Sequence, residues 1–191
     1  MVLPVDAQIW LSALLFLLSM GAILPLVRRD YLRRGGLSHL GAFLQLVVWF
    51  AFHVFLALVV WGDLWPSVHE TIPRNWIGAL PALPGLGLCL AGMGTFRSLK
   101  KIFGQEANRL VISGVYQWTR NPQYTGYGLV LLGVVLAYWS ATAWLALPAY
   151  ALLVWATVRI EEEHLEALFS EQYRAYCRQV PRFIGWPGST T

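Results

Sequence analysis

Charged residues are scarce in this sequence, and their scarcity argues against an ordinary soluble domain. Asp, Glu, Lys and Arg make up 13% of the 191 residues, whereas hydrophobic residues make up 57%. Soluble domains average about 25% charged residues. The net charge is +4, but the basic residues lie between apolar runs instead of gathering on a polar domain, so we expect no nucleic-acid partner. The composition therefore predicts an integral membrane protein.

Cysteine is also rare. The two cysteines, Cys89 and Cys177, lie in an apolar run and in a polar tail, respectively. Because these environments differ, we expect two structural thiols and no disulfide. Neither a CxxC nor an HExxH pattern occurs, and the sequence therefore predicts no metal site.

Long apolar runs are abundant. The first three, 7–27, 40–61 and 77–96, are each about twenty residues long, enough to cross a hydrocarbon core of about 30 Å. The fourth run, 124–158, is too long for one crossing and is interrupted at 140–142. It predicts a helical hairpin of 124–139 and 142–158, with one span or a re-entrant pair as the alternative.

These runs predict an all-α, polytopic integral membrane protein with about five transmembrane helices. We expect a single membrane domain over 1–191, with three N-terminal helices in 1–96 and the cofactor-binding and catalytic part in 97–191. The third run contains two prolines and five glycines, which predict a kink and close helix packing. In the second run, buried polar residues such as Gln45 and His53 are expected to face other helices. For His53 we expect an interhelical hydrogen bond, with a functional role as the alternative.

The tail after the hairpin is amphipathic. Glu161, Glu162 and Glu163 are followed at helical spacing by Leu165, Leu168, Phe169, Tyr173, Tyr176 and Val180. This apolar stripe predicts a helix that ends at Pro181. It would either lie on the bilayer or dock against the connector, the segment 97–123 that precedes the hairpin.

The basic residues indicate an orientation. With five crossings, the segments 28–39, 97–123 and the tail share one side, and they carry four, five and four basic residues, which is 13 of the 14. Only Arg74 lies opposite. The positive-inside rule then predicts a cytoplasmic C-terminus and active site, in a bacterial inner membrane or the endoplasmic reticulum.

A helical hairpin returns the chain to the face where it left. The segment with Tyr116, Arg120, Asn121 and Tyr124 should therefore meet the segment that begins at Arg159. Acidic, basic and aromatic groups would converge there, and they would suit a cationic, aromatic cofactor. The alternative is a set of interfacial salt bridges without a ligand.

Two motifs carry a family resemblance. The first is Leu110-Val111-x-x-Gly114-Val115-Tyr116-x-x-x-Arg120-Asn121-Pro122-x-Tyr124-x-Gly126. The second is Glu161-Glu162-x-x-Leu165-x-x-x-Phe169-x-x-x-Tyr173-x-x-Tyr176-x-x-x-Val180-Pro181-Arg182. Together they resemble the isoprenylcysteine carboxyl methyltransferase family, which is related to the membrane phospholipid N-methyltransferases. The resemblance covers about 100–184.

The resemblance implies S-adenosylmethionine (SAM) as cofactor and a set of site residues. The implied cofactor contacts are Leu110, Val111, Tyr116, Asn121, Pro122, Gln123, Tyr124, Glu161 and Glu162. Arg159 is the candidate to bind a substrate carboxylate, and Arg159 and Glu162 are the candidate catalytic residues. Asn121 stands where the family often has His, and it cannot become cationic. The family arginine often sits further before the paired glutamates than Arg159 does.

The expected function is methyl transfer to a lipophilic or prenylated substrate among the membrane lipids, first of all to the carboxylate of an isoprenylcysteine-like molecule. An ionised carboxylate is already a nucleophile, so this reaction needs positioning and desolvation but no general base. N-methylation of a phospholipid amine, or methylation of another small lipophile, is the alternative. A non-enzymatic transporter or scaffold is the alternative from another class. A transporter predicts ionisable residues deep in several helices, whereas here nearly all lie near helix ends.

Overall fold

The computed structural model describes residues 3–67, 72–95, 109–138 and 141–184, with side chains outside 61–75. Its elements are α1 (Val5–Arg34), α2 (His39–Ser67), α3 (Ile72–Thr95), η1 (Gly114–Gln117), α5 (Pro122–Tyr138), η2 (Ala143–Leu145) and α6 (Ala146–Gln179). The described part of the chain contains no strand. The all-α prediction is confirmed.

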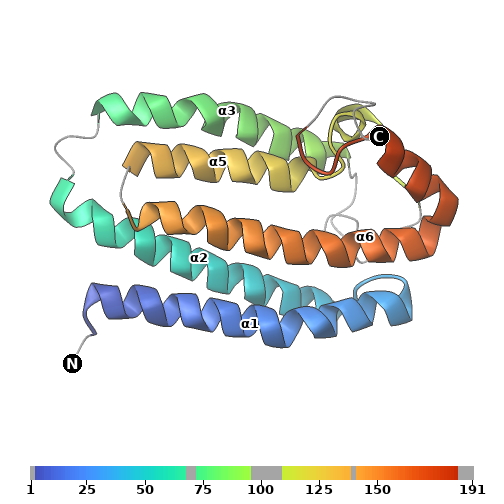
Figure 1. Ribbon diagram of the computed structural model, residues 1–191, viewed down its shortest axis with the longest axis horizontal. Coiled ribbons are helices and arrows are strands. Elements are labelled where there is room, and N and C mark those ends of the chain that lie inside the picture. The colour runs from blue at the N-terminus through green and yellow to red at the C-terminus, as the bar shows by residue number, and fades with distance from the viewer. Residues whose placement is uncertain (1–2, 68–71, 96–108, 139–140, 185–191) are drawn as a thin grey trace.

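Four helical segments are long and apolar enough to cross a membrane: Val5–Arg34, His39–Val60, Trp76–Thr95 and Ala143–Gln179. The fifth apolar helix, α5, has 17 residues and forms the predicted hairpin with α6 (Figure 1). Many large apolar side chains, such as Leu14, Phe50 and Leu80, are exposed on the helix surfaces. In water this exposure would be costly, but in a bilayer it is the expected outward face. The polytopic membrane architecture is confirmed.

The helices pack as two pairs joined by a fifth helix. α1 packs mainly on α2, α3 packs mainly on α5, and α6 contacts both α1 and α5. Figure 1 shows α6 running between the two pairs along the length of the molecule. Where α1, α2, α5 and α6 meet, the core contains Phe16, Phe52, Leu131 and Leu153, each no more than 2% exposed.

Glycines bring α3 and α5 into backbone contact. A Cβ atom added to Gly85 would lie 2.5 Å from the carbonyl oxygen of Gly126, and one added to Gly126 would lie 2.7 Å from the amide nitrogen of Cys89. Gly78 faces Gly133 in the same way one heptad away. The prediction of close packing is confirmed at Gly78, Gly85 and Gly92, while Gly87 and Gly94 face open space.

Two helices extend further than the apolar runs. The basic segment after the first apolar run continues α1 to Arg34, and Gly35 caps the helix with a left-handed φ of 68°. Arginine has a high helix propensity, so a helix can continue beyond its apolar run. Hydrophobicity alone therefore does not indicate where such a helix ends. α2 likewise continues past the second apolar run, 40–61, to Ser67.

The tail helix is a continuation of the last membrane helix. α6 spans Ala146–Gln179, but Ser170 has non-helical angles of φ 44° and ψ −113°, which put a kink between two helical segments. The apolar stripe of the tail packs on the connector: Tyr173, Tyr176 and Val180 form a cluster with Leu110 and Phe169. Of the two expected positions, the structure therefore shows docking against the connector.

Candidate functional site

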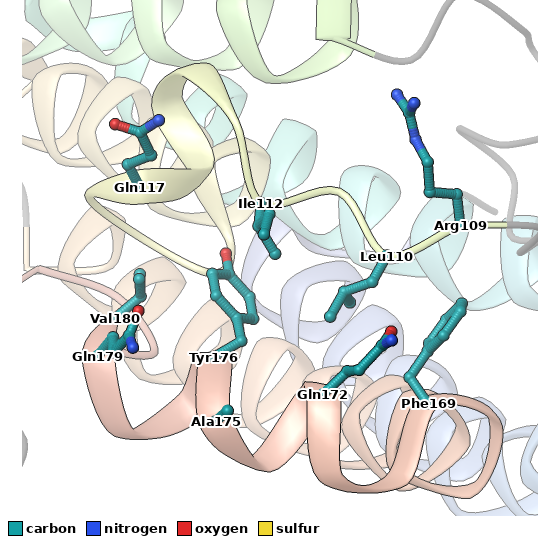
Figure 2. Close-up of a pocket in the computed structure, with 10 residues that line it drawn as sticks. All are labelled: Arg109, Leu110, Ile112, Gln117, Phe169, Gln172, Ala175, Tyr176, Gln179 and Val180. Atoms are coloured by element: carbon teal, nitrogen blue, oxygen red, sulfur yellow. The ribbon is translucent and has the colours of Figure 1, made fainter.

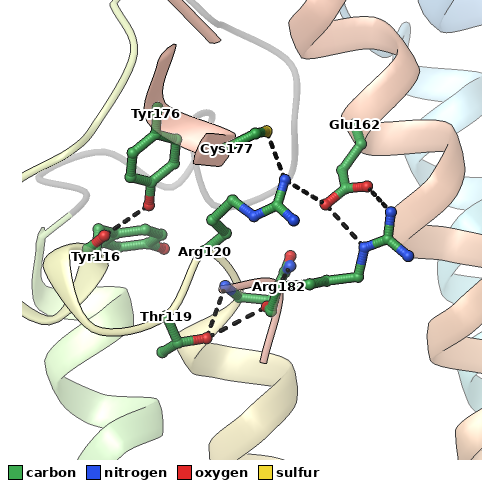
Figure 3. A network of polar contacts seen from close by, with 8 residues as sticks. Tyr116, Thr119, Arg120, Glu162, Tyr176, Cys177 and Arg182 are labelled. Atoms are coloured by element: carbon green, nitrogen blue, oxygen red, sulfur yellow. Dashed lines mark hydrogen bonds and ion pairs between the residues drawn. The ribbon is translucent and has the colours of Figure 1, made fainter. Parts of the chain in front are cut away.

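The two polar segments that flank the hairpin are joined by an ion-pair network. Glu162 of α6 receives Nη1 of Arg120 at 3.2 Å and Nε of Arg182 at 3.0 Å, and Nη2 of Arg182 binds its second oxygen (Figure 3). The side chains of Arg120 and Glu162 are 12% and 14% exposed. The hydrogen bond to Glu162 raises the pKa of the Arg182 guanidinium. The predicted meeting of the two segments is confirmed.

Backbone hydrogen bonds fix the turn before α5 to the residues after α6. The Arg120 N–H donates to the carbonyl of Pro181 at 3.0 Å. The Asn121 side-chain amide donates to the carbonyl of Arg182 at 2.9 Å, and the Thr119 hydroxyl reaches the same carbonyl at 3.3 Å. Asn121 thus has a defined partner that needs only an N–H donor, and a cationic side chain is not required for this contact.

The short helix η1 places Tyr116 under the end of α6. It begins at Gly114, whose φ of 63° suits a residue without a Cβ atom. The hydroxyl of Tyr176 donates to the carbonyl of Tyr116 at 2.6 Å. Burial raises the pKa of the Tyr116 phenol. The aromatic residues of the two motifs therefore lock the connector onto the tail.

A second polar pair lies nearer the membrane. The Tyr124 hydroxyl of α5 donates to Oε1 of Glu161 at 2.6 Å. The side-chain amide of Gln45 on α2 hydrogen-bonds the same carboxylate. The Trp49 ring stacks on the Tyr124 ring, with centroids 5.9 Å apart and an interplanar angle of 8°. Three helices thus converge on Glu161.

The three consecutive glutamates have different partners. Glu162 is bound by two arginines, as described above, and Glu163 is bound by Nε and Nη2 of Arg28 on α1 at 2.6 and 2.5 Å. Glu161 receives hydrogen bonds from the neutral groups of Tyr124 and Gln45, and no basic side chain of the described residues pairs with it. The sequence left open which glutamate faces a cofactor, and Glu161 is the one whose charge is not neutralised by an arginine.

A cavity of about 730 Å³ lies between the connector and the bent end of α6 (Figure 2). Its walls are formed by Arg109, Leu110, Ile112, Gln117, Phe169, Gln172, Ala175, Tyr176, Gln179 and Val180. Cavities of about 300–1,000 Å³ are typical of small-molecule sites. Of the expected cofactor contacts, Leu110 lines this cavity, and Val111 lies next to it in the connector.

Arg159 is not brought into this constellation. It is exposed, and its guanidinium lies 4.8 Å above the ring of Trp155. Two residues along a helix rotate a side chain by about 200°, so Arg159 and Glu161 lie on opposite faces of α6. The contact with Trp155 is typical of an arginine at a membrane interface. Its predicted role with a substrate carboxylate stays a prediction.

The remaining expected contacts lie at the start of α5. Pro122 is the first residue of the helix and is fully buried, a position where the missing N–H of proline costs nothing. Gln123 packs against Gly92 of α3, and its Nε2 atom is buried without a hydrogen-bond partner among the described residues. The Gln123 carbonyl accepts the Cys89 thiol at 3.1 Å.

Sequence reasoning missed the contributions of α1 and α2 to the site. Arg28 was counted only as a topology signal, and Trp49 was not singled out. Gln45 and His53 gave a usable signal, because a polar residue in an apolar run is expected to face another helix. The His53 expectation is confirmed, since Nε2 of His53 lies 2.9 Å from the Tyr127 hydroxyl of α5. Arg97, Lys100 and Lys101 lie outside the described residues.

Known proteins resemble this chain in sequence. A family model described as Phospholipid methyltransferase matches residues 87–172. Protein-S-isoprenylcysteine O-methyltransferase B of Arabidopsis thaliana is 32% identical over 91 residues, 46% of this chain and 45% of that protein. The human Protein-S-isoprenylcysteine O-methyltransferase is 30% identical over 131 residues, 61% of this chain and 43% of that protein.

A further relative has a different name. The Cobalt-zinc-cadmium resistance protein CzcN of Cupriavidus metallidurans is 35% identical over 119 residues, 61% of this chain and 54% of that protein. The chain thus spans about half the length of the curated relatives it matches. No solved structure matches. In the described part of the chain, no group of three or more His, Cys, Asp or Glu residues is placed to hold a metal ion. The matched family model, the similar relatives and the two joined motifs together support the predicted resemblance to the isoprenylcysteine methyltransferase family.

Proposed function

We propose that this protein is a SAM-dependent methyltransferase of the membrane that acts on a lipophilic substrate. The observation that carries the proposal is the Glu161 carboxylate, which receives hydrogen bonds from Tyr124 and Gln45 but has no basic partner among the described residues. A carboxylate kept without a counter-ion beside aromatic rings suits a ligand that brings its own positive charge. SAM carries such charges on its sulfonium and its amino group.

The residues present fit the cofactor in three respects. Glu161 supplies the negative charge, Tyr116 and Tyr124 supply aromatic surface, and the cavity between the connector and the bent end of α6 is large enough for a small molecule. Leu110, Val111, Pro122 and Gln123 would form the walls through the connector and the start of α5. The Arg120–Glu162–Arg182 network would hold these two segments in register, and Asn121 would do the same through the Arg182 carbonyl.

Methyl transfer to a carboxylate requires the protein mainly to position the two reactants. SAM supplies an electrophilic methyl group when it is bound. A substrate carboxylate is already nucleophilic when ionised, so the chain needs to orient it and exclude water. This requirement agrees with the lack of a general-base triad in the sequence. An amine substrate would have to lose a proton, and a nearby carboxylate such as Glu161 would accept it.

The substrate proposed first is the carboxylate of an isoprenylcysteine-like molecule. The names of the relatives in Arabidopsis thaliana and Homo sapiens support it. The matched family model is described as Phospholipid methyltransferase, and this description supports N-methylation of a phospholipid amine as the second candidate. Both substrates are lipids that would reach the site from the bilayer.

A radiolabel assay separates the two candidates. Purified protein in detergent is incubated with methyl-labelled SAM and either N-acetyl-farnesylcysteine or phosphatidylethanolamine. Label that mild base releases as methanol identifies an ester, and label that stays on the lipid identifies an amine. Glu161→Ala should abolish either reaction. If the protein neither transferred label nor bound SAM in calorimetry, the methyltransferase proposal would be refuted.

A further inference from the structure

The side chain of Gln45 offers an acceptor that no group of the described residues uses. Gln45 lies on α2, outside the residues that the family model matches. Its amide bonds the Glu161 carboxylate, which can only accept, so Nε2 must be the donor and Oε1 must point elsewhere. Oε1 is buried and has no hydrogen-bond partner in the part of the chain that the structure describes. An unpaired buried acceptor costs about 1–3 kcal/mol, a cost that a bound donor would remove.

The acceptors around this point outnumber the donors. An ionised carboxylate can accept about four hydrogen bonds, and Glu161 receives those of Tyr124 and Gln45. Its neighbour Glu162 is already bound by two arginines, and those arginines are therefore not available to Glu161. Trp49, one turn along α2 from Gln45, covers the Tyr124 ring. The site thus combines one anionic and one neutral acceptor with aromatic walls.

We propose that Gln45 Oε1 and the Glu161 carboxylate together bind a primary ammonium group. An ammonium has three N–H donors and a positive charge, so it can satisfy both acceptors at once. A sulfonium has no N–H and would leave Gln45 unpaired. The ammonium can come from the amino-acid end of the cofactor or from the headgroup of an amine phospholipid. The inference rests on the proposed function and assigns α2 a binding residue.

The test compares two ligands that differ in the amino group alone. S-adenosylhomocysteine and its deaminated analogue, in which hydrogen replaces the amine, are titrated into the full-length protein in detergent by calorimetry. Gln45→Met keeps the length of the side chain and removes both its Oε1 acceptor and the Nε2 donor to Glu161. The substitution should lower the affinity for S-adenosylhomocysteine about tenfold, as expected for one hydrogen bond to a charged group. It should change the affinity for the deaminated analogue less than twofold.

Controls separate binding from folding. Gln8→Met makes the same substitution at a half-buried position at the start of α1 and should change neither affinity. Gln45→Asn keeps the amide but shortens it, and it should give an intermediate loss. Melting temperatures are recorded for every variant. If Gln45→Met weakened both ligands equally, or neither, the cofactor amine would not be the group that Gln45 binds.

The second arm uses the amine lipid. If Gln45→Met left S-adenosylhomocysteine binding unchanged but lowered methyl transfer to phosphatidylethanolamine, and not to N-acetyl-farnesylcysteine, the ammonium would be that of the substrate. The inference would be overturned if Gln45→Met changed neither the relative affinity for the two nucleoside ligands nor the relative rate of methyl transfer to the two substrates. The methyltransferase proposal would still stand in that case. A wild-type protein that bound neither nucleoside ligand and transferred no methyl group would overturn both.

Discussion

At the scale of single residues, three neighbouring carboxylates of the same type have separate surroundings. Glu163 pairs with an arginine in a partly exposed position, Glu162 holds two arginines in a nearly buried network, and Glu161 meets neutral donors. A carboxylate whose charge is matched by arginines contributes to folding, whereas one without a counter-ion is available to a ligand. The division of roles therefore follows from the partners and not from the residue type.

This division predicts different consequences for two otherwise identical substitutions. Glu161→Gln should lower SAM affinity at least tenfold with little change in melting temperature, because it removes the charge that the ligand needs. Glu162→Gln should cost about 3 kcal/mol of stability, because it leaves the largely buried Arg120 without its counter-ion. Calorimetry and thermal unfolding in the same detergent measure the two effects. The assignment is contradicted if Glu162→Gln loses binding while its stability stays unchanged.

At the scale of helices, the contact between α3 and α5 depends on a glycine seam. Gly126→Ala would place a methyl group 2.5 Å from the carbonyl oxygen of Gly85, and the helices would have to separate. We expect a loss of about 2 kcal/mol or more, in line with overpacked cores. Gly87→Ala is the matched control, because a Cβ atom there meets nothing within 4 Å. It should be neutral or stabilise the helix by up to about 1 kcal/mol. Equal melting temperatures for the two variants would argue against the seam.

The bend in α6 gives a second prediction at this scale. Ser170 has a φ of 44° and a ψ of −113°, angles that are strained for any residue with a Cβ atom. Ser170→Gly should therefore raise the melting temperature by relieving about 1 kcal/mol, whereas Ser170→Ala should not. Glycine normally weakens a helix interior, so a loss of stability with Ser170→Gly would indicate an unbent α6 in solution.

The sequence predicted the elements better than it predicted their contacts. The apolar runs located α2, α3 and the hairpin, and the stripe from Leu165 to Val180 predicted that the tail would be helical and one-sided. Helix ends were missed where arginines continue α1. Periodicity states which residues share a face but not which helix covers that face, so the pairing of Arg28 with Glu163, 135 residues apart, was out of reach. The two motifs found the segments of the site, and Gln45 and Trp49 needed the fold.

At the scale of the whole molecule, the site lies at one end of the bundle, where the connector and the tail meet (Figure 1). We propose that this end faces the cytoplasm, because 13 of the 14 basic residues belong to segments on that side. In a bacterial host, a green fluorescent protein fused to the C-terminus should fluoresce, and an alkaline phosphatase fused there should be inactive. The reverse pattern would place the site outside and contradict the orientation.

The lengths of α5 and α6 connect the site to the lipid around it. α5 has 17 residues and is about 25 Å long, whereas the part of α6 before its bend at Ser170, residues 146–169, is about 36 Å long. The hydrocarbon core of a bilayer is about 30 Å thick, which is more than the length of α5 and less than that of α6. When the acyl chains change in length, we therefore expect α5 to be accommodated by thinning of the bilayer and α6 by tilting. The Tyr124–Glu161 hydrogen bond joins these two helices. We therefore expect acyl-chain length to change the geometry of this contact. Reconstitution into lipids of graded chain length should reveal an optimum in the affinity for SAM.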